Sequence, residues 1–455
     1  MQPTIVLCLC LGTLTACSLT PPRPPTAVQL PASYRQVPPT SDNAAELGWR
    51  EVLTEPQLQQ LVALGLEHNR DLRVATLNVA AMRAQVQQQD AALLPSVDLS
   101  LAASRQRLGA GTPVQPQYSA GIASTAFELD LFGRLRSLSA AAQARYLASD
   151  QGRRAAQLSL INAIAEAYLE HQRARAQQQL SERMLADWRS TLHITEQQHQ
   201  ARQRSGIDLS AVQAHVASAE ADLQARSREL QLASHALQFL IGTELPAPAA
   251  LADPLTAAPV RTVLPAGLPS DLLIRRPDIM QAEQELQGAQ ADIGAARAAF
   301  FPRIALTTSF GLGSSEFGDL FKGASRSWSF APQITQPLFH GGQLQAELSL
   351  ARIRSSMAVA QYEKAIQNAF REVSDALAGC QTIAPQMEAQ QRVLGASRQR
   401  AQWAVLRYRQ GLDGRLELLD AQRQAYAAEA ALIDLQREQY RYALALYKAL
   451  GGGVS

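Results

Sequence analysis

The sequence has few aromatic residues, few charged residues and no long apolar run. Of its 455 residues only 5% are aromatic and 18% are charged, and the formal net charge is +2. Nucleic-acid-binding proteins usually gather basic side chains on one face, so this charge balance argues against that class. No apolar run reaches the roughly 18–20 residues that a membrane-spanning helix requires. Two classes remain: a large soluble protein rich in helices, or a membrane protein whose span is not helical.

Cysteine is also scarce, and its position near the N-terminus is informative. Residues 5–14 form an apolar stretch too short to cross a bilayer, and a Leu-Thr-Ala-Cys sequence ends at Cys17. This pattern is typical of a signal peptide. A cysteine directly after Leu-x-Ala resembles the lipobox of bacterial lipoproteins, which implies cleavage before Cys17 and acylation of Cys17. We expect residues 1–16 to be the signal peptide and residues 17–50 a lipid-anchored, proline-rich tether.

An ordinary cleaved signal peptide with an incidental cysteine is the alternative. The residues before the apolar stretch include no Lys or Arg, although this region of a signal peptide is normally positive, which leaves open a native start upstream of Met1. Ser18 stands where an Asp usually retains lipoproteins at the inner membrane, so the resemblance implies the outer membrane. Cys380 is then the other cysteine of the mature chain, which excludes an intrachain disulfide.

The chain repeats itself at an offset of 207 residues. The matching pairs are Asp71-Leu72 with Asp278-Ile279, Leu94-Pro95 with Phe301-Pro302, and Leu131-Phe132 with Leu338-Phe339. Chance similarity between alanine-rich helices would not also preserve the proline and Leu-Phe positions. We therefore predict two copies of one unit, residues 51–245 and 271–455, joined by a connecting segment at 246–270.

Each copy is predicted to begin with a helix and two strands. The helices span roughly 56–93 and 276–300 and end before proline. Alternating apolar and polar residues predict strands at about 96–108 and 118–132 in the first copy, and at about 303–313 and 326–338 in the second. Their lengths fit tilted transmembrane β-strands of ~9–11 residues.

A soluble hairpin with one buried face would show the same alternation. The predicted signal and lipid anchor favour the outer membrane, where barrels are the available span. Four strands cannot close a barrel, because about eight are the practical minimum. If these strands span the membrane, several chains must share one barrel, and the sequence pattern leaves their number open.

Two very long helices follow the strands, at about 133–206 and 342–411. A helix of ~70 residues would measure on the order of 105 Å. Pro385 is expected to interrupt the second one. Return helices are predicted at 209–241 and 416–450, so that Gly206 and Gly411 lie at hairpin tips near 206 and 411 and supply a left-handed turn. Lipid-facing strands above a long helical tube form the geometry of a duct.

Several motifs are specific enough to carry a family resemblance. They are Phe-Glu-Leu-Asp-Leu-Phe-Gly-Arg at 127–134, Gly-Leu-Pro-Ser-Asp-Leu-Leu at 267–273 with Arg-Arg-Pro-Asp-Ile at 275–279, Ala-Ala-Arg-Ala-Ala-Phe-Phe-Pro at 295–302, and Leu-Leu-Asp-Ala-Gln-Arg at 418–423. Together they resemble the TolC-type outer-membrane efflux proteins, in their lipoprotein (NodT-like) branch. The resemblance implies a mainly α fold with membrane β: a long antiparallel α-helical coiled-coil barrel and a transmembrane β-barrel assembled from three chains, with four strands each.

The implied function is that of a passive exit duct in a tripartite efflux system for drugs or other small toxic solutes. The implied partners are two further copies of the chain, a periplasmic adaptor (membrane fusion protein), an inner-membrane transporter of the RND type and outer-membrane lipid. A duct for type I protein secretion remains an alternative. A structural coiled-coil lipoprotein without a pore is another, but it would not explain matched amphipathic strands in both copies.

The resemblance also assigns residues at the periplasmic tip. Leu416, Asp420 and Arg423 map onto rings that narrow the tunnel, and Glu417 stands where some relatives place another acid. Their i,i+3 and i,i+4 spacing allows Leu416, Asp420 and Arg423 to share one helix face. In this interpretation Asp420 and Arg423 hold neighbouring helices together, and opening breaks those pairs. The alternative is a solvated intrahelical Asp420–Arg423 pair worth ~0.2–0.5 kcal/mol.

Four tip residues are candidates for adaptor docking: Arg204, Gly206, Arg409 and Gly411. The alternative is purely structural, because glycine closes turns and arginine stabilises helix C-termini. The seven histidines form no metal-binding motif, and the sequence contains neither a Gly-x-Ser-x-Gly nor a Gly-Lys-Thr phosphate loop. We therefore expect no enzyme activity, no cofactor, no metal and no nucleic-acid partner.

Overall fold

A computed structural model describes residues 19–22, 44–107, 109–246, 258–267, 269–410, 412 and 414–452. The predicted signal peptide, Cys17 and Gly411 lie outside the described residues. Within the described ranges, no helix is both long enough and apolar enough to cross a bilayer.

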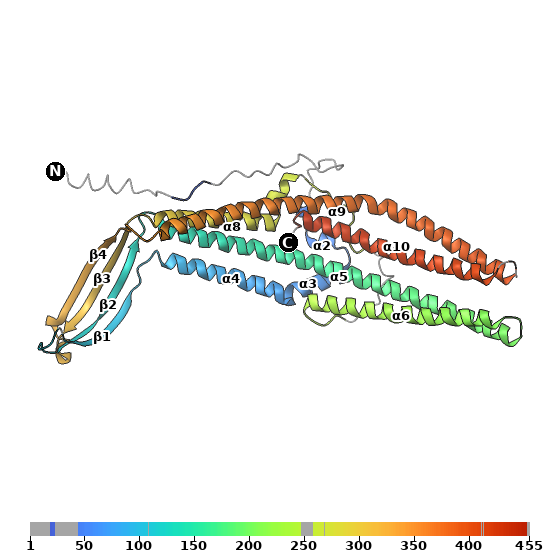
Figure 1. The fold of residues 1–455 in the computed structure, drawn as a ribbon, viewed down its shortest axis with the longest axis horizontal. Coiled ribbons are helices and arrows are strands. Elements are labelled where there is room, and N and C mark those ends of the chain that lie inside the picture. The colour runs from blue at the N-terminus through green and yellow to red at the C-terminus, as the bar shows by residue number, and fades with distance from the viewer. Residues whose placement is uncertain are drawn as a thin grey trace. The chain divides into compact units, whose positions relative to one another are not determined.

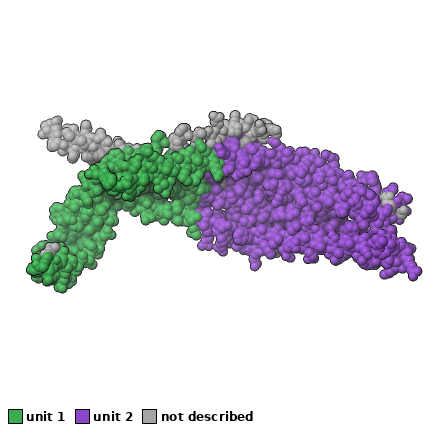
Figure 2. Space-filling view, viewed as in Figure 1, with its two compact units in different colours: residues 1–27, 77–151, 281–364 green, residues 28–76, 152–280, 365–455 purple. Residues whose placement is uncertain are grey.

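The chain divides into two compact units, each built from parts of both sequence repeats. The first comprises Met1–Ala27, Leu77–Gln151 and Gln281–Lys364. The second comprises Val28–Thr76, Gly152–Met280 and Ala365–Ser455 (Figure 2). The repeats are therefore intertwined in both units.

The first unit contains one antiparallel sheet in the order β1-β2-β3-β4 (Figure 1). Its strands are β1 (Asp98–Gln106), β2 (Gln115–Leu129), β3 (Arg303–Ser314) and β4 (Arg326–Thr335). All four predicted strands are present, with ends shifted by a few residues. The central pair, β2 with β3, joins the two sequence repeats.

The register of the sheet separates an apolar face from a small, polar one. Residues directly opposite each other on paired strands project to the same face. One such row contains Leu99, Ile122, Phe310 and Trp328. The neighbouring row, on the opposite face, contains Ser100, Gly121, Gly311 and Ser327. The predicted alternation of β3 and β4 is confirmed, and it extends across all four strands.

A β-bulge in β2 keeps this separation intact along the whole strand. The register shifts between Ser124 and Phe127, and Ala126 adopts a left-handed conformation with φ 53°. The Ala126 amide donates to Thr307 Oγ1 at 3.1 Å. One extra residue exchanges odd and even positions, so Phe127 joins the apolar face that Ile122 occupies before the bulge.

The long helices form one hairpin in each copy. They are α5 (Arg134–Gln200) with α6 (Gly206–Ile241), and α9 (Gln343–Arg409) with α10 (Arg415–Ala449). The predicted interruption at Pro385 is wrong, because α9 continues through it. Pro385 is exposed, so water can hydrate the carbonyl group that its ring leaves without a donor.

The predicted helix at 56–93 is two helices, which corrects the sequence interpretation. α3 (Pro56–His68) and α4 (Arg70–Ala91) are separated at Asn69. Asn69 Oδ1 accepts the Leu72 amide at 2.9 Å, while its Nδ2 donates to the Leu240 carbonyl at 2.9 Å. An N-cap in mid-sequence therefore starts a new helix. The counterpart α8 (Pro277–Ala298) is continuous, preceded by the short α7 (Leu272–Arg275).

The second unit has the largest described apolar core. Trp49 of α2 (Trp49–Val52) packs there with Ile164, Leu237 and Tyr447. At its edge, the Arg276 guanidinium is buried and donates to Asp278, to Glu372 at 2.8 Å and to the Ala449 carbonyl at 2.7 Å. The Arg-Arg-Pro-Asp motif is thus a structural anchor that ties α8, α9 and α10 together.

Candidate functional site at the hairpin tips

The motif at 127–134 turns the chain from β2 into α5. Arg134 donates from Nε and Nη2 to the Glu128 carboxylate at 2.8 and 2.6 Å. Asp130 accepts the Arg136 amide at 2.9 Å, which satisfies a free donor at the start of α5. Gly133 has φ 75°, a conformation that favours glycine. The motif therefore has a structural explanation at the strand–helix junction.

The tip of the first hairpin corrects the prediction for Gly206. Gly206 is the first residue of α6, and the left-handed residue of the turn is Arg202, with φ 56°. Ser205 caps α6 by accepting the Asp208 amide at 3.2 Å, and Asp208 accepts in return from the Ser205 amide. A side-chain capping box closes this tip.

Arg204 joins the two hairpin tips. Its Nη2 donates to the Tyr408 hydroxyl at 2.9 Å, and its guanidinium carbon lies 5.3 Å from the centre of the Tyr408 ring. Arg409, the last residue of α9, is exposed. The structure therefore separates two predicted docking arginines: Arg204 is engaged inside the chain, whereas Arg409 faces solvent.

A buried arginine that sequence reasoning missed lies beside this contact. Arg415 is only 8% exposed, and its Nε and Nη1 atoms have no hydrogen-bond partner among the described residues. Burial, together with the nearby positive charge of Arg204, lowers the pKa of Arg415. Its sequence context, directly after a hairpin turn, is that of an exposed residue and carries no signal of burial.

The predicted gate acids meet in one cluster. Arg400 Nη2 lies 2.7 Å from Glu417 and 3.3 Å from Asp420. Asp420 also accepts from Arg423 at 3.0 Å and from Gln424 Nε2 at 2.8 Å. Within one chain, Asp420 and Arg423 form the intrahelical i,i+3 pair of the alternative interpretation, and Arg400 connects Glu417 to it.

Two members of this cluster, Gln424 and Arg400, were not predicted from the sequence. Gln424 stands four residues after Asp420, so helical spacing could have found it. Arg400 belongs to α9 and comes close only because the hairpin folds back. Leu416 is 82% exposed and lies outside the ion cluster, on the same first turns of α10.

Further contacts hold the first hairpin against the second. Glu429 of α10 accepts from Arg183 of α5 and from Arg398 of α9, each at 2.8 Å. The Tyr426 hydroxyl donates to the Asp187 carboxylate. Burial alone would raise the pKa of Glu429, but the hydrogen bonds from both arginines outweigh it and hold that pKa below its usual range.

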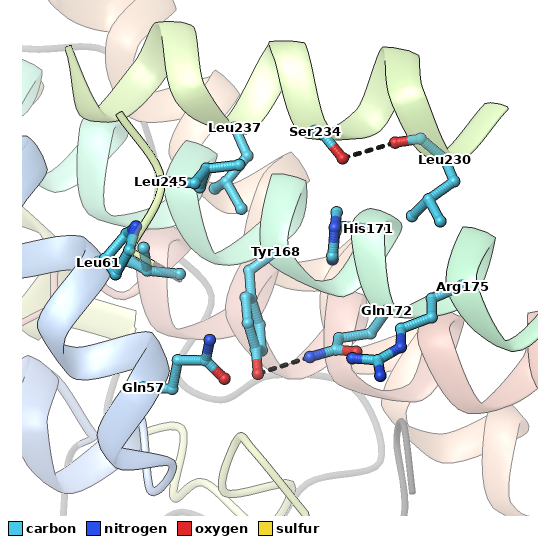
Figure 3. Close-up of a pocket in the computed structure, with 11 residues that line it drawn as sticks. Gln57, Leu61, Tyr168, His171, Gln172, Arg175, Leu230, Ser234, Leu237 and Leu245 are labelled. Atoms are coloured by element: carbon cyan, nitrogen blue, oxygen red, sulfur yellow. Dashed lines mark hydrogen bonds between the residues drawn. The ribbon is translucent and has the colours of Figure 1, made fainter. Parts of the chain in front are cut away.

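A half-open cavity of about 340 Å³ lies farther along the hairpin in the second unit (Figure 3). Leucine side chains cover one part of its wall, and Tyr168, His171 and Gln172 project from α5 into the other. Gln172 Nε2 donates to the Tyr168 hydroxyl at 2.7 Å, and that hydroxyl donates to Glu55 at 2.5 Å. Burial and the charge of Arg175 lower the pKa of His171. No group of three metal-ligating side chains occurs in the described part of the chain.

This arrangement of hairpins and sheet belongs to a known class of membrane channel proteins. The outer membrane efflux protein family matches residues 61–243 and 268–452. The chain is a member of that family.

Relatives match over nearly the full length. The chain is 42% identical to the antibiotic efflux pump outer membrane protein ArpC of Pseudomonas putida, covering 97% of this chain and 93% of that protein. It is 38% identical to the cation efflux system protein CusC of Escherichia coli strain K12, covering both in full. A crystal structure of the open Neisseria gonorrhoeae MtrE outer membrane channel superposes with a TM-score of 0.88 at 37% identity, covering 96% and 99%.

Proposed function

We propose that three copies of this chain form the passive outer-membrane exit duct of a tripartite efflux pump. A periplasmic adaptor and an inner-membrane transporter of the RND type would deliver drugs or other small toxic solutes to it. Family membership and the names of the relatives support this role, since several are outer membrane components of efflux pumps. The chain itself would perform no chemistry and need no cofactor.

The observation that carries the proposal is the two-faced sheet with unpaired edges. Within the described residues, β1 pairs only with β2, and β4 pairs only with β3. A lone sheet would leave the backbone groups of both edges without partners in hydrocarbon. Pairing β1 of one copy with β4 of the next satisfies them, and the Leu99–Trp328 row then faces lipid while the Ser100–Ser327 row faces the lumen.

The periplasmic end would be closed by rings of Leu416, Glu417, Asp420 and Arg423, one set from each chain. Opening requires the second hairpin to move away from the first, which separates pairs such as Glu429–Arg183. A change in partner contacts would bias this two-state element.

The tips would dock the adaptor through their exposed residues. Arg204, Gly206, Arg409 and Gly411 remain our candidates. Arg409 is exposed and would contact the adaptor directly, whereas Arg204 would position the tip through its hydrogen bond to Tyr408. Exposed apolar side chains at the tips, Ile207 at 83% and Leu412 at 62%, support a protein contact there. Acylation of Cys17 would anchor each chain in the outer membrane.

Single-channel recording in planar bilayers tests the duct itself. The purified full chain should form complexes of three chains by light scattering in detergent, and these should conduct ions. Crosslinking a β1 cysteine such as Leu101→Cys to a β4 cysteine of another copy, in a Cys380→Ala background, should yield a covalent trimer. A monomer, or a trimer without conductance at any applied voltage, would refute the proposal.

A further inference from the structure

The cavity of about 340 Å³ in the second unit has an apolar end and a polar end (Figure 3). Leu61, Leu237 and Leu245 gather at the apolar end, and the first two are each only 2% exposed. Gln172 and Arg175 project from α5 toward the other end. A cavity of ~150 Å³ already holds a benzene molecule. This one therefore has room for a ligand of about two fused rings.

A buried amide oxygen in this cavity has no hydrogen-bond partner. The Tyr168 hydroxyl has one proton, which it donates to Glu55, so it can only accept from the Gln172 side chain. The Gln172 amide is therefore oriented with Nε2 toward Tyr168 and Oε1 away from it. Gln172 is 4% exposed, and its Oε1 has no partner in the described part of the chain. An unpaired buried acceptor costs free energy, so the cavity favours a guest that carries a hydrogen-bond donor.

The charges around this acceptor favour an uncharged guest. Arg175 follows Gln172 by three residues on α5, so the two side chains share one helix face. Burial raises the pKa of the Tyr168 hydroxyl and Glu55 raises it further, whereas Arg175 lowers it. Burial and the charge of Arg175 lower the pKa of His171, which is therefore neutral at pH 7. One positive and one negative side chain thus flank the site, and a charged guest would be repelled by one of them.

We propose that this cavity binds a small uncharged aromatic alcohol, a phenol or a naphthol. Its hydroxyl group donates to Gln172 Oε1 and accepts from the Arg175 guanidinium, since a hydroxyl is both donor and acceptor. Its ring leaves water to pack against Tyr168 and the leucines of the apolar end. A water molecule would satisfy Oε1 but leave the apolar end unfilled. The site does not depend on the proposed duct, because all its residues belong to the second unit of one chain.

Isothermal titration calorimetry of the purified full chain with 2-naphthol tests the site. A titration into detergent micelles alone is the blank. 2-Naphthol is uncharged at pH 7, as phenols are, and should bind once per chain. Naphthalene lacks the hydroxyl group and 2-naphthoate is an anion, so each should bind roughly tenfold more weakly than 2-naphthol.

Two substitutions separate the acceptor from the space around it. Gln172→Leu removes Oε1 but keeps a side chain of similar size, so 2-naphthol should bind roughly tenfold more weakly while naphthalene binds at least as tightly. A variant that merely disturbed the fold would lose both probes. Leu230→Trp enlarges a side chain of the cavity wall and should abolish binding of both. Leu232→Trp is the matched control, because Leu232 lies on the same helix, is 60% exposed and is outside the wall.

Each contrary outcome has a definite meaning. No saturable binding of 2-naphthol above the blank would show that the cavity holds water only. Equal affinity of 2-naphthol for Gln172→Leu and the unchanged chain would overturn the role of the amide oxygen. Equal affinity for 2-naphthoate would show an anion site at Arg175 instead. Equal losses in Leu230→Trp and Leu232→Trp would place the probe outside this cavity.

Discussion

Arg400 Nη2 lies 2.7 Å from the carboxylate of Glu417. This contact ties α9 to α10 inside one hairpin, close to the tip that we propose as the gate. The same guanidinium reaches Asp420 at 3.3 Å. The acids that would ring the tunnel are therefore held by an arginine of their own chain, which fixes the helix that carries them.

Removing the Asp420 carboxylate should raise conductance. Asp420→Ala breaks the contacts to Arg400, Arg423 and Gln424, so the start of α10 loses its restraints. Partly exposed pairs contribute about 0.2–1 kcal/mol each, and three chains multiply the effect, so we expect a rise of roughly threefold or more. Single-channel recordings of Asp420→Ala and Arg423→Ala measure it, with Arg392→Ala, an exposed α9 arginine, as control. Wild-type conductance in both variants would remove these residues from the gate.

Loss of the Tyr426 hydroxyl should ease separation of the hairpins. Tyr426→Phe removes the hydrogen bond to Asp187 while keeping the ring, which costs about 1 kcal/mol per chain. The open fraction should therefore increase severalfold in planar bilayers. Tyr442→Phe on the same helix is the control, because its hydroxyl makes no hydrogen bond to the described residues. An equal effect of both variants would show that the Asp187 contact does not restrain opening.

Secondary structure was predicted best where the apolar residues follow a regular period, as they do in the strands and the long helices. Strands β1 to β4 follow from period-two alternation, because each apolar side must leave water. The long helices follow from uninterrupted helical spacing. The bulge at Ala126 was not predicted, although the exchange of apolar positions between Ile122 and Phe127 signals it. The predicted strand at about 118–132 ran through this position as if the alternation were unbroken.

The candidate site was predictable only along one helix at a time. Asp420 and Arg423 are neighbours through helix geometry, so their contact could be expected. Arg400 and Glu429 acquire their partners through the hairpin fold, which pairs residues far apart in the sequence. Arg202 replaced the expected glycine in the left-handed turn because the Ser205–Asp208 capping box determines where α6 begins. The preference of glycine for left-handed turns therefore did not decide the position of the turn; the capping of α6 did.

Acidic pH should loosen the hairpins through Glu429. Its pKa lies below the usual 4.5 because Arg398 and Arg183 outweigh the effect of burial. A carboxylate with a lowered folded pKa stabilises the paired state above pH ~4.5 and loses this contribution as the pH falls through the folded value. Conductance should therefore rise below about pH 4.5. Glu429→Gln should be more open at neutral pH and lack this step. Hydrogen bonds from Arg441 and Arg437 also lower the pKa of Glu438 against the effect of burial, but both arginines lie on its own helix. A step that persists in Glu429→Gln would assign the response elsewhere.

Arg276 should be far more important for stability than its neighbour Arg275. Its buried guanidinium serves Asp278, Glu372 and the Ala449 carbonyl, and removing one partner of such a network costs about 3–5 kcal/mol. Both carboxylates are partly exposed, so water can solvate them once the guanidinium is gone. We therefore expect Arg276→Gln to lower the free energy of unfolding by about 3 kcal/mol, the lower end of this range. Arg275→Gln loses one partly exposed pair with Glu46, and such pairs are worth about 0–1 kcal/mol. Thermal unfolding followed by circular dichroism should show a clearly lower Tm for Arg276→Gln alone. Equal losses in both variants would mean that the buried network does not anchor α8 to α10.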